Sequence, residues 1–405
     1  MREPRVSCPI HPVSTPPTIH RFGRANPKAN RLFYFALPPT AFAVSAASIN
    51  AAGRATNGWT RAIIEKPFGS NSKSYEELSA ALSASLKEDE MYRIDHFLAK
   101  EVVQNVLTLR FGNSTFNPIW NRHYISNVQV TFKEDIGTDG RGGYFDSFGI
   151  VRDVCQNHLL QILALVAAEA PVSLASDDIR DEKVKVVRCI RPINLDDCVL
   201  GQYGKSADGK QPAYLDDSTV PPGSVTPTFA CIKFFIDNPR WDGVPFIMKA
   251  GKALDNKKTE IRIQFKPAPG NLYPDAAPNE LVLRIQPNEA MYMKTNAKLP
   301  GMGHELDQVE LDMTYGSRFK DIRLPLAYER LILDVMRGDH SLFVRDDELK
   351  HAWKLFDPLL EAIDKKTIPV HIYPRGSRGP AQGDSMVAGC GFVRNERYQW
   401  GDSKK

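Results

Sequence analysis

The chain has 405 residues and a formal net charge of only +4 at neutral pH, with 42% hydrophobic and 25% charged residues. This is the composition of a globular protein with more than one domain. The small net charge argues against a nucleic-acid-binding protein, in which basic residues are concentrated. A membrane protein is not expected either, because the longest apolar run (159–168) is about half of the roughly 20 residues needed to span a bilayer.

The six cysteines are far apart, and none belongs to a C-x-x-C pair. Their spacing is unlike that of a structural zinc site, and no bound metal is expected. A low cysteine density suits free thiols in a reducing compartment. The first twenty residues contain five prolines and no apolar core of a secretory signal. The sequence therefore favours a cytoplasmic location.

The first elements predict a parallel unit. Residues 1–30 are rich in Pro, Arg and Asn and are expected to be disordered. The run RLFYFALPP (31–39) predicts a buried strand that ends at its prolines. The Ala-rich segment 40–56 predicts a helix, and RAIIEKPFG (61–69) predicts a second strand. A strand, a helix and a strand in this order predict a βαβ unit with parallel pairing.

Helices are predicted next. Ser74 and Glu77 have the spacing of a capping box, which indicates the start of a helix. A second helix is predicted from about His96 to Leu109. A strongly apolar third helix is predicted from Ile150 to Ala168.

The rest of the chain contains several segments in which apolar and polar residues alternate: VQVTFK (128–133), EIRIQFK (260–266), ELVLRIQ (280–286) and VELDM (309–313). This period of two predicts a large, mainly antiparallel sheet with one face covered. Helices are predicted at 327–338 and 347–363. The predicted fold is therefore part of a parallel-sheet α/β domain followed by a larger α+β domain.

The segment YRIDHFLAKE (92–101) brings an Asp-His pair close to a lysine. If the segment is helical from His96, then His96 and Lys100 lie one turn apart on the same face. Two cations so placed repel each other unless an anion such as a phosphate lies between them. Asp95 points about 100° away from His96 and can serve another partner. The alternative is a solvated charged helix face, which is commoner.

In RDVCQNHLLQ (152–161), the polar residues Asp153, Asn157 and His158 interrupt an apolar helix. Polar groups on a buried face need hydrogen-bonding partners. One interpretation of His158 is a core histidine that satisfies this requirement. The other is a general base oriented by a carboxylate, for which Asp95 is a candidate.

Two glycine-containing segments and a set of cations complete the candidates. The glycines of GTDGRGGYFDSFG (137–149) would let the backbone approach a ligand, although the segment does not fit G-x-G-x-x-G. GKSADGKQ (204–211) lacks the Ser or Thr of a Walker loop, so we attribute its near-match to chance. The cations either converge on phosphates or are scattered solubilising charges: Lys66, Lys249, Lys252, Lys257, Lys258, Arg262, Arg284 and Lys294.

These segments resemble those of the glucose-6-phosphate dehydrogenase family. RIDHFLAKE (93–101) is similar to the family signature RIDHYLGKE. Further segments resemble family segments in the same order: EKPFG, FKEDIGTDGRGGYFDSFGIVRDVCQNHLLQ, RDEKVKV, LGQY, WDGVPFI, GKAL, QPNEA, LDMTYG, YERLILDV and GSRGP. The resemblance extends from about Asn30 to Trp400. It implies NADP-dependent oxidation of glucose 6-phosphate to 6-phosphoglucono-lactone, the first step of the oxidative pentose phosphate pathway.

The resemblance also implies roles for individual residues. His158 would be the general base, and Asp95 would orient it and stabilise its charge. His96 and Lys100 would bind the sugar phosphate, and Lys66 would lie between substrate and coenzyme. The other implied substrate contacts are Glu134, Asp153, Lys252, Lys257 and Gln286. A second, structural NADP is implied at Lys249, Lys258, Arg262, Arg284, Lys294, Asp312, Arg378 and Trp400.

The implied organisation has three parts. Residues 1–30 are unmatched, residues 31–95 form the C-terminal part of a Rossmann-type NADP-binding domain, and residues 96–405 form the substrate and dimerisation domain. The implied partners are glucose 6-phosphate, NADP and further copies of the chain in a homodimer or homotetramer. No nucleic acid or membrane is implied.

Three departures from the family pattern affect these expectations. Nothing in residues 1–30 resembles the family's glycine-rich turn, which binds the coenzyme pyrophosphate at a helix N-terminus. One alternative is therefore a catalytically impaired form that binds sugar phosphate or NADP and associates with full-length subunits.

The other two departures lie in the signature segment. Phe97 replaces the Tyr of the signature, so weaker substrate binding is expected. Ala99 replaces Gly, which matters only where a positive φ is required.

Overall fold

The computed structural model describes residues 29–270 and 272–395. Near its start, the described chain forms a four-stranded sheet with the order β1-β2-β3-β12. Its strands are β1 (Arg31–Phe35), β2 (Thr60–Ile64), β3 (Met91–Ile94) and β12 (Phe343–Val344). β1, β2 and β3 pair in parallel, which confirms the predicted βαβ unit. β12 pairs antiparallel with β3, so this sheet also includes a segment from far along the chain. The domain boundary at residue 95 stays a prediction.

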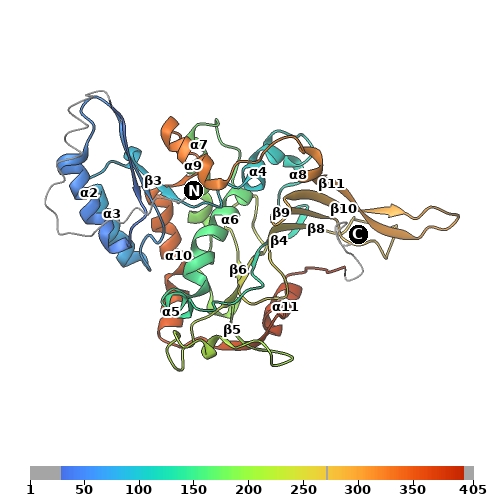
Figure 1. Ribbon diagram of the computed structural model, residues 1–405. Helices are drawn as coiled ribbons and strands as arrows, with labels where there is room; N and C mark the ends of the chain where they lie inside the picture. The colour runs from blue at the N-terminus through green and yellow to red at the C-terminus, as the bar shows by residue number, and fades with distance from the viewer. Residues whose placement is uncertain (1–28, 271, 396–405) are drawn as a thin grey trace.

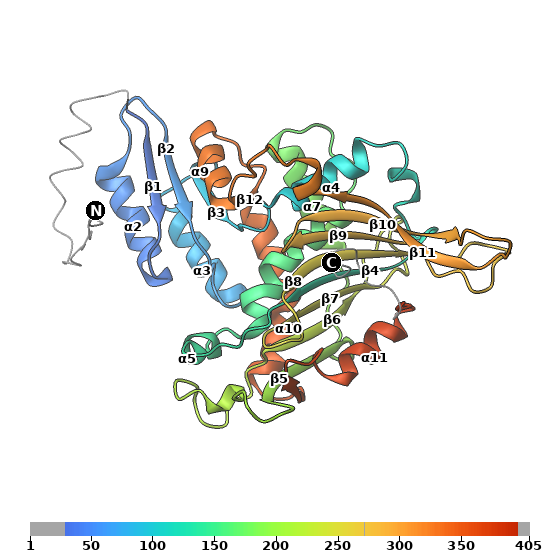
Figure 2. The same ribbon diagram turned by 45° about the vertical axis from the view of Figure 1, so that its right-hand side comes forward.

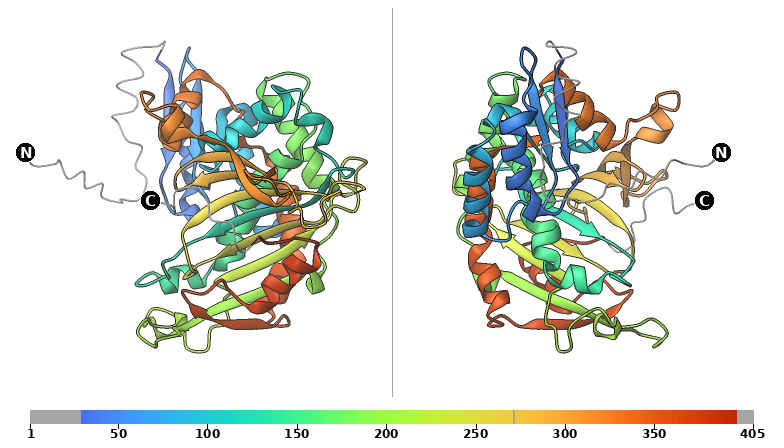
Figure 3. Two further views of the ribbon diagram at one scale, coloured as in Figure 1. Left: turned by 90° about the vertical axis from the view of Figure 1, so that its right-hand side faces the viewer. Right: turned by 60° about the vertical axis from the view of Figure 1, so that its left-hand side comes forward.

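Helices cover both faces of the small sheet (Figures 2 and 3). They are α2 (Phe42–Ser48), α3 (Ser72–Ser83) and α9 (Ala327–Arg337). Side chains alternate along β2, so Ala62 and Ile64 pack in the core that includes α2 and α3, whereas Ile63 packs with Leu331 and Val335 of α9. The predicted helix at 40–56 ends in a short π-helical turn, Ile49–Gly53.

The start of α3 differs from the predicted capping box. Asn71 is the N-cap, its side chain accepts a hydrogen bond from the Ser74 backbone N–H, and the Ser74 hydroxyl accepts one from the Asn71 backbone N–H. Ser74 is therefore the third helical residue and not the cap. The sequence allowed both registers, because Asn and Ser are both favoured at an N-cap.

The large sheet has nine strands in the order β11-β10-β9-β8-β4-β7-β6-β5-β13. The strands are β4 (Ile125–Lys133), β5 (Cys198–Ser206), β6 (Phe229–Phe234), β7 (Phe246–Gly251), β8 (Lys258–Phe265), β9 (Glu280–Gln286), β10 (Ala290–Lys298), β11 (Leu306–Thr314) and β13 (Val370–Arg375). Only the β4–β7 and β5–β13 pairs are parallel, so the sheet is mainly antiparallel, as predicted. The β10–β11 hairpin projects from the molecule on the side opposite the small sheet (Figure 1).

The two faces of the large sheet have different surroundings. Val128, Val130 and Phe132 of β4 belong to the main core, whereas Gln129 and Thr131 line a polar pocket. The remaining helices are α4 (Glu101–Phe111), α5 (Gly142–Asp146), α6 (Leu160–Ala167), α7 (Ser176–Cys189), α8 (Tyr315–Arg318), α10 (Asp346–Asp364) and α11 (Ala381–Gly389). α11 lies beside the polar pocket, next to the large sheet in Figure 2.

Two helices differ from their predicted form. The helix expected from His96 begins only at Glu101, and residues 96–99 form a turn. The Asp95 carboxylate accepts a hydrogen bond from the Phe97 backbone N–H at 3.0 Å, and such side-chain bonds favour turns over helix starts. The helix predicted at 150–168 is present, but its first part, Val151–Leu159, has π-helical hydrogen bonding.

Within the described part of the chain, no helix is both long and apolar enough to cross a membrane.

Candidate active site

The centre of the candidate site is a contact between Asp95 and His158. Asp95 directly follows β3, and His158 lies in the π-helical segment. The His158 Nδ1 and the Asp95 Oδ1 are 2.6 Å apart, and both side chains are buried. π-helical segments often occur at functional sites. The structure therefore brings together the two residues that the sequence proposed as base and orienting carboxylate.

The charge of Asp95 fixes the assignment of the imidazole proton. Burial alone would raise the pKa of Asp95, but the attraction and hydrogen bond of His158 outweigh it and lower the pKa to about 2. An ionised carboxylate can only accept hydrogen bonds, so we assign the proton to Nδ1 of His158. The Nε2 atom is then left as the acceptor, which is the form that a general base needs.

Lys66 lies at this acceptor. Its Nζ is 3.0 Å from the His158 Nε2 and donates to the Asp153 main-chain oxygen at 2.8 Å. Lys66 follows β2 closely, just as Asp95 follows β3. Parallel strands present their carboxyl ends at one edge of a sheet, where open α/β sheets bind ligands. The topology therefore places Lys66 and Asp95 at the same edge of the small sheet, where Asp95 contacts the Nδ1 of His158 and Lys66 contacts its Nε2.

A cationic subsite lies beside His158. The His96 and His158 rings have centroids 4.7 Å apart. Burial lowers the pKa of His96 to about 4, and His158 and Lys100 add to this lowering. Burial also lowers the pKa of Lys100, and nearby Lys257 adds to the effect while Glu289 opposes it. Lys100 therefore lies close enough to affect His96, and Lys257 close enough to affect Lys100, although His96 and Lys100 are not on one helix as predicted.

Two aromatic rings hold the histidines. Phe97 is buried and stacks on His158 with 4.5 Å between ring centroids. Tyr328 of α9 stacks on His96 at 5.9 Å. Ala99 has no positive φ, so its replacement of Gly causes no backbone strain. Tyr328 lies in the segment YERLILDV, which resembles the family, but its place beside His96 depends on the packing of α9 and was not predictable from the sequence.

Next to Lys66 lies a pocket of about 540 Å³ with an alternating row of charges. Lys66 bonds Asp153 at 3.3 Å, and Asp153 is 3.9 Å from Lys252, which bonds Glu134 at 2.6 Å. The glycine-containing segment 137–149 forms one wall through several residues: Gly137, Thr138, Asp139, Arg141, Tyr144, Phe145 and Phe148. Charged donors and acceptors in a concave pocket suit a polar, hydroxylated ligand.

Four predicted substrate residues lie outside this lining: His96 and Lys100 of the cationic subsite, and Lys257 and Gln286. Gln286 is the last residue of β9 and pairs with Thr259 of β8. Lys257 is exposed just before β8 and contributes to the cationic subsite through its effect on Lys100. Neither residue lines the pocket of about 540 Å³.

Asp95, His96 and His158 also present one potential metal-ligand atom each, all within 4.8 Å of one another. Lys66 and Lys100 both act on His96 in the direction that disfavours further positive charge. The local charge therefore favours an anion over a metal ion at this position.

A second cluster of cations lines a pocket of about 410 Å³ between the large sheet and α11. It includes four residues of the predicted structural NADP site: Lys249, Lys258, Arg262 and Arg378. Lys133 and Arg394, which the sequence analysis missed, also line it, together with the carboxylates Glu260 and Asp384. Six cationic side chains against two carboxylates suit a ligand with several negative charges.

Among the described residues, the other predicted members of this site do not line the pocket. Lys294 bonds Glu280 at 2.7 Å, and Glu280 also bonds Arg262 of the lining, so Lys294 is connected to the cluster through Glu280. Arg284 on β9 pairs with Glu260, which lines the pocket, and Asp312 lies on β11. Trp400 lies outside the described residues.

Comparisons with known proteins agree with this geometry. The family model described as glucose-6-phosphate dehydrogenase, C-terminal domain, matches residues 107–400, and the model of the family's NAD binding domain matches residues 18–105. The chain belongs to the glucose-6-phosphate dehydrogenase family. The predicted family, and the predicted combination of a Rossmann-type coenzyme domain with a large antiparallel sheet, are therefore confirmed.

Individual relatives are similarly close. A glucose-6-phosphate 1-dehydrogenase of Dictyostelium discoideum is 54% identical over 92% of this chain and 76% of its own length. The enzyme of the same name from Emericella nidulans is 54% identical over 92% of this chain and 73% of its own length. A solved glucose-6-phosphate dehydrogenase in complex with its substrate glucose-6-phosphate has a TM-score of 0.90 and 50% identity, covering 94% of this chain and 79% of that one. The Mycobacterium avium enzyme has a TM-score of 0.78 and 36% identity, covering 91% of this chain and 77% of that one.

Proposed function

We propose that this chain oxidises glucose 6-phosphate to 6-phosphoglucono-lactone with NADP as the oxidant, at the site formed by Asp95 and His158. The observation that supports this most directly is the 2.6 Å contact between Asp95 Oδ1 and His158 Nδ1, which leaves Nε2 as a proton acceptor. Membership of the family supports the same substrate and coenzyme.

The residues of the chain supply proton transfer and binding. In the proposed reaction, His158 Nε2 takes the proton of the C1 hydroxyl as the C1–H bond breaks and the C1–O bond becomes a carbonyl. Asp95 stabilises the imidazolium that forms, because its carboxylate already accepts the Nδ1 proton. Lys66, now 3.0 Å from Nε2, must give up this contact when the hydroxyl arrives.

The place for the coenzyme follows from the sheet. NADP⁺, when bound, supplies the hydride acceptor. The carboxyl ends of β2 and β3 lead to Lys66 and Asp95, and ligands of open parallel sheets bind at such ends. This arrangement supports the assignment of Lys66 to a position between coenzyme and substrate.

The sugar phosphate is assigned to the cationic subsite of His96, Lys100 and Lys257. Burial lowers the pKa of both His96 and Lys100, and neighbouring positive charges add to the lowering, so a bound anion would stabilise their charged forms. The sugar hydroxyls are assigned to Glu134, Asp153 and Lys252, whose charged groups line the adjacent pocket.

Replacement of His158 by Asn tests the proposed base. NADPH formation with glucose 6-phosphate should fall by at least about 10²-fold, because general-base catalysis typically contributes 10²–10⁴-fold. A variant with the activity of the parent would contradict the assignment. A folded parent that binds glucose 6-phosphate but forms no NADPH would instead indicate a binding protein that associates with active subunits.

We also propose that the chain assembles into a homodimer or homotetramer through the large sheet. β11 is the edge strand of that sheet, and Val309 and Leu311 on it are exposed. Exposed apolar groups at a sheet edge favour protein contacts. Light scattering on the purified chain should give a multiple of the monomer mass, and Leu311→Lys should lower it. A monomeric parent would contradict the proposal.

A cytoplasmic location is proposed from the cysteines. The five cysteines within the described residues all have free thiols, which a reducing compartment maintains. Relatives from Arabidopsis thaliana and Solanum tuberosum are named chloroplastic. A fluorescent fusion of the complete natural protein distinguishes the two locations, and chloroplast import would overturn the proposal.

A further inference from the structure

A fully buried ion pair contacts the helix of His158 one turn after this residue, at Gln161. The Lys183 Nζ of α7 is 3.1 Å from the Glu348 Oε2 of α10, and neither side chain is exposed. The same Lys183 Nζ donates a hydrogen bond to the Gln161 Oε1 at 2.8 Å. Gln161 lies three residues after His158 on the same continuous helix. The start of α10 is therefore linked through Lys183 to the helix that contains the proposed base.

The start of α10 is also linked to the strand that leads to Asp95. Val344 and Phe343, just before α10, pair with Arg93 and Ile94 of β3. The buried Arg93 bonds Glu88 at 2.7 Å, and the Glu88 Oε1 accepts a hydrogen bond from the Asp346 backbone N–H at 3.1 Å.

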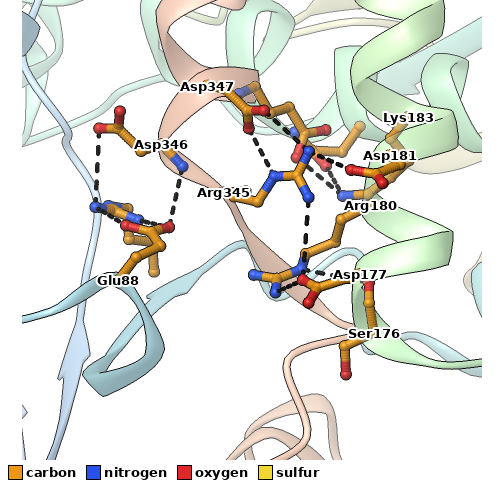
Figure 4. A network of polar contacts seen from close by, with 12 residues as sticks. Glu88, Ser176, Asp177, Arg180, Asp181, Lys183, Arg345, Asp346 and Asp347 are labelled. Carbon is orange, nitrogen blue, oxygen red and sulfur yellow. Dashed lines mark hydrogen bonds and ion pairs between the residues drawn. The ribbon is translucent and has the colours of Figure 1, made fainter.

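Figure 4 shows these contacts on two sides of one helix end. Arg345 points toward α7, where it bonds Asp181 at 2.6 Å, whereas Asp346 lies beside Glu88. Residues from both sides also line one cavity close to the proposed base. A small cavity is lined by residues of β3, β12, α10 and the His158 helix: Ile94, Asp95, Gln161, Val344 and Leu349.

We propose that the first turn of α10 positions the Asp95–His158 pair, with Lys183, Glu348 and Gln161 as positioning residues for the reaction. Glu348 holds the helix of His158 through Lys183 and Gln161. Phe343 and Val344, just before α10, hold β3 next to Asp95. The hydrogen bond between Asp95 and His158 depends on the relative placement of these two elements. The proposal rests on the proposed function of His158 as the base.

The chemistry of the pair supports a role beyond stability. Replacing a buried ion pair by apolar residues of similar volume is often neutral or stabilising, so a pair of this kind is weak evidence of stabilisation. The position of the Lys183 side chain is constrained, because its Nζ contacts both Glu348 and Gln161. A buried group that must satisfy two partners on different helices holds those helices in one register.

The test compares the parent with Gln161→Met, Lys183→Met and the double variant Lys183→Met/Glu348→Leu. Gln161→Met removes only the hydrogen bond to the His158 helix, and the double variant removes both buried charges. Each should lower kcat by about tenfold or more, because a small misplacement of catalytic groups costs up to about 10²-fold. KM for glucose 6-phosphate should change less than about threefold, and the pH dependence of kcat/KM should shift.

Lys185→Met is the matched control, since Lys185 lies on the same helix, is exposed, and bonds Glu182 one turn away. It should keep the parent's kcat and pH dependence. If Lys183→Met fails to fold, the other two variants decide. Folded Gln161→Met and double variants with the kcat and pH dependence of the control would overturn the proposal. An inactive parent would instead contradict the proposed function.

Discussion

His158 Nδ1 and Asp95 Oδ1 are 2.6 Å apart although the two residues are 63 positions apart in the chain. Asp95 comes from the carboxyl end of a parallel strand, and His158 comes from a π-helical segment next to the antiparallel sheet. The proposed catalytic pair thus forms only when both parts of the chain are folded and docked.

Replacing Asp95 by Asn should lower kcat by about 10²–10⁴-fold with a smaller effect on KM. The uncharged amide keeps the shape of the side chain but neither stabilises an imidazolium nor enforces the proton on Nδ1. Steady-state assays of NADPH formation measure the effect. Asp364→Asn is a suitable control, because Asp364 is exposed and bonds only Arg152 among its described contacts. Equal kcat values for parent and Asp95→Asn would argue against the pair.

Substrate binding should involve proton uptake by His96. The pKa of His96 in the free protein is about 4, so the ring is neutral at pH 7. A phosphate beside it raises this pKa. The bound state then holds more protons, so affinity increases as pH falls and is lost as pH rises through the raised pKa.

Calorimetry in buffers of different ionisation enthalpy measures this uptake. The phosphate group of the substrate also exchanges protons on binding. Subtracting the proton uptake of His96→Gln from that of the parent removes this contribution. The parent should take up more protons per bound glucose 6-phosphate than the variant near pH 6. The same uptake in both would show that His96 remains neutral or lies away from the phosphate.

Phe97→Tyr should tighten substrate binding, because the family signature has Tyr at this position. A hydrogen bond to a charged group is worth about 1.5–3 kcal/mol, which corresponds to a KM about tenfold lower or more. The hydroxyl should also destabilise the free protein slightly, since Phe97 is buried. Steady-state kinetics and thermal unfolding test the two effects. An unchanged KM would mean that the ring edge faces away from the phosphate.

NADP should bind to the pocket beside α11 independently of catalysis. NADP should raise the unfolding temperature of His158→Asn as it does that of the parent, because a ligand stabilises the state that binds it. Arg378→Gln should weaken this stabilisation, since Arg378 lines the pocket and bonds only Asp384 among its described ion pairs. Lys298→Gln, at an exposed site on β10, provides the control. An equal NADP response in all variants would exclude this pocket.

His340 should make the protein less stable in acid. Burial and nearby Arg180 lower its pKa from 6.5 to about 4, and its ring stacks on Tyr92 at 3.9 Å. The depressed pKa means that the unfolded chain binds the proton more readily. This contribution is therefore present above pH 6.5 and is lost as pH falls toward 4. The part lost between pH 6.5 and pH 5 is about 2 kcal/mol, because one pKa unit corresponds to about 1.4 kcal/mol.

His340→Phe removes this titration while keeping an aromatic ring against Tyr92. Chemical denaturation at pH 7.5 and pH 5 should show a smaller loss of unfolding free energy for the variant than for the parent. Equal losses in the two proteins would indicate that another group is responsible for the acid sensitivity.

Much of the fold followed from local patterns. The alternation in residues 128–133 and 280–286 predicted strands of one large sheet because a sheet with one covered face imposes a period of two. Strand order did not follow, because the parallel β4–β7 pair joins segments more than a hundred residues apart. The start of α4 was misplaced because the Asp95 side chain, by bonding the Phe97 N–H, competes with the helix.

Site residues that belong to a recognisable sequence motif could be predicted. Contacts that depend on tertiary packing could not. Asp95 and His158 were found from the signature segments around them. The stacking of Tyr328 on His96 depends on how α9 packs across the small sheet, and the stacking of Phe97 on His158 depends on how the turn after β3 meets the π-helical segment. No local pattern specifies either contact. Arg284 and Asp312 were grouped with the second pocket by resemblance; neither lines it, although Arg284 pairs with the lining residue Glu260, so their place in that site stays a prediction.

The most direct test of the account is NADPH formation by the purified chain with glucose 6-phosphate and NADP⁺, compared with the His158→Asn variant. If His158 is the base, the parent produces NADPH absorbance, and the folded variant forms NADPH at least about 10²-fold more slowly. Equal rates in the two proteins, or a folded and substrate-binding parent that forms no NADPH, would contradict it.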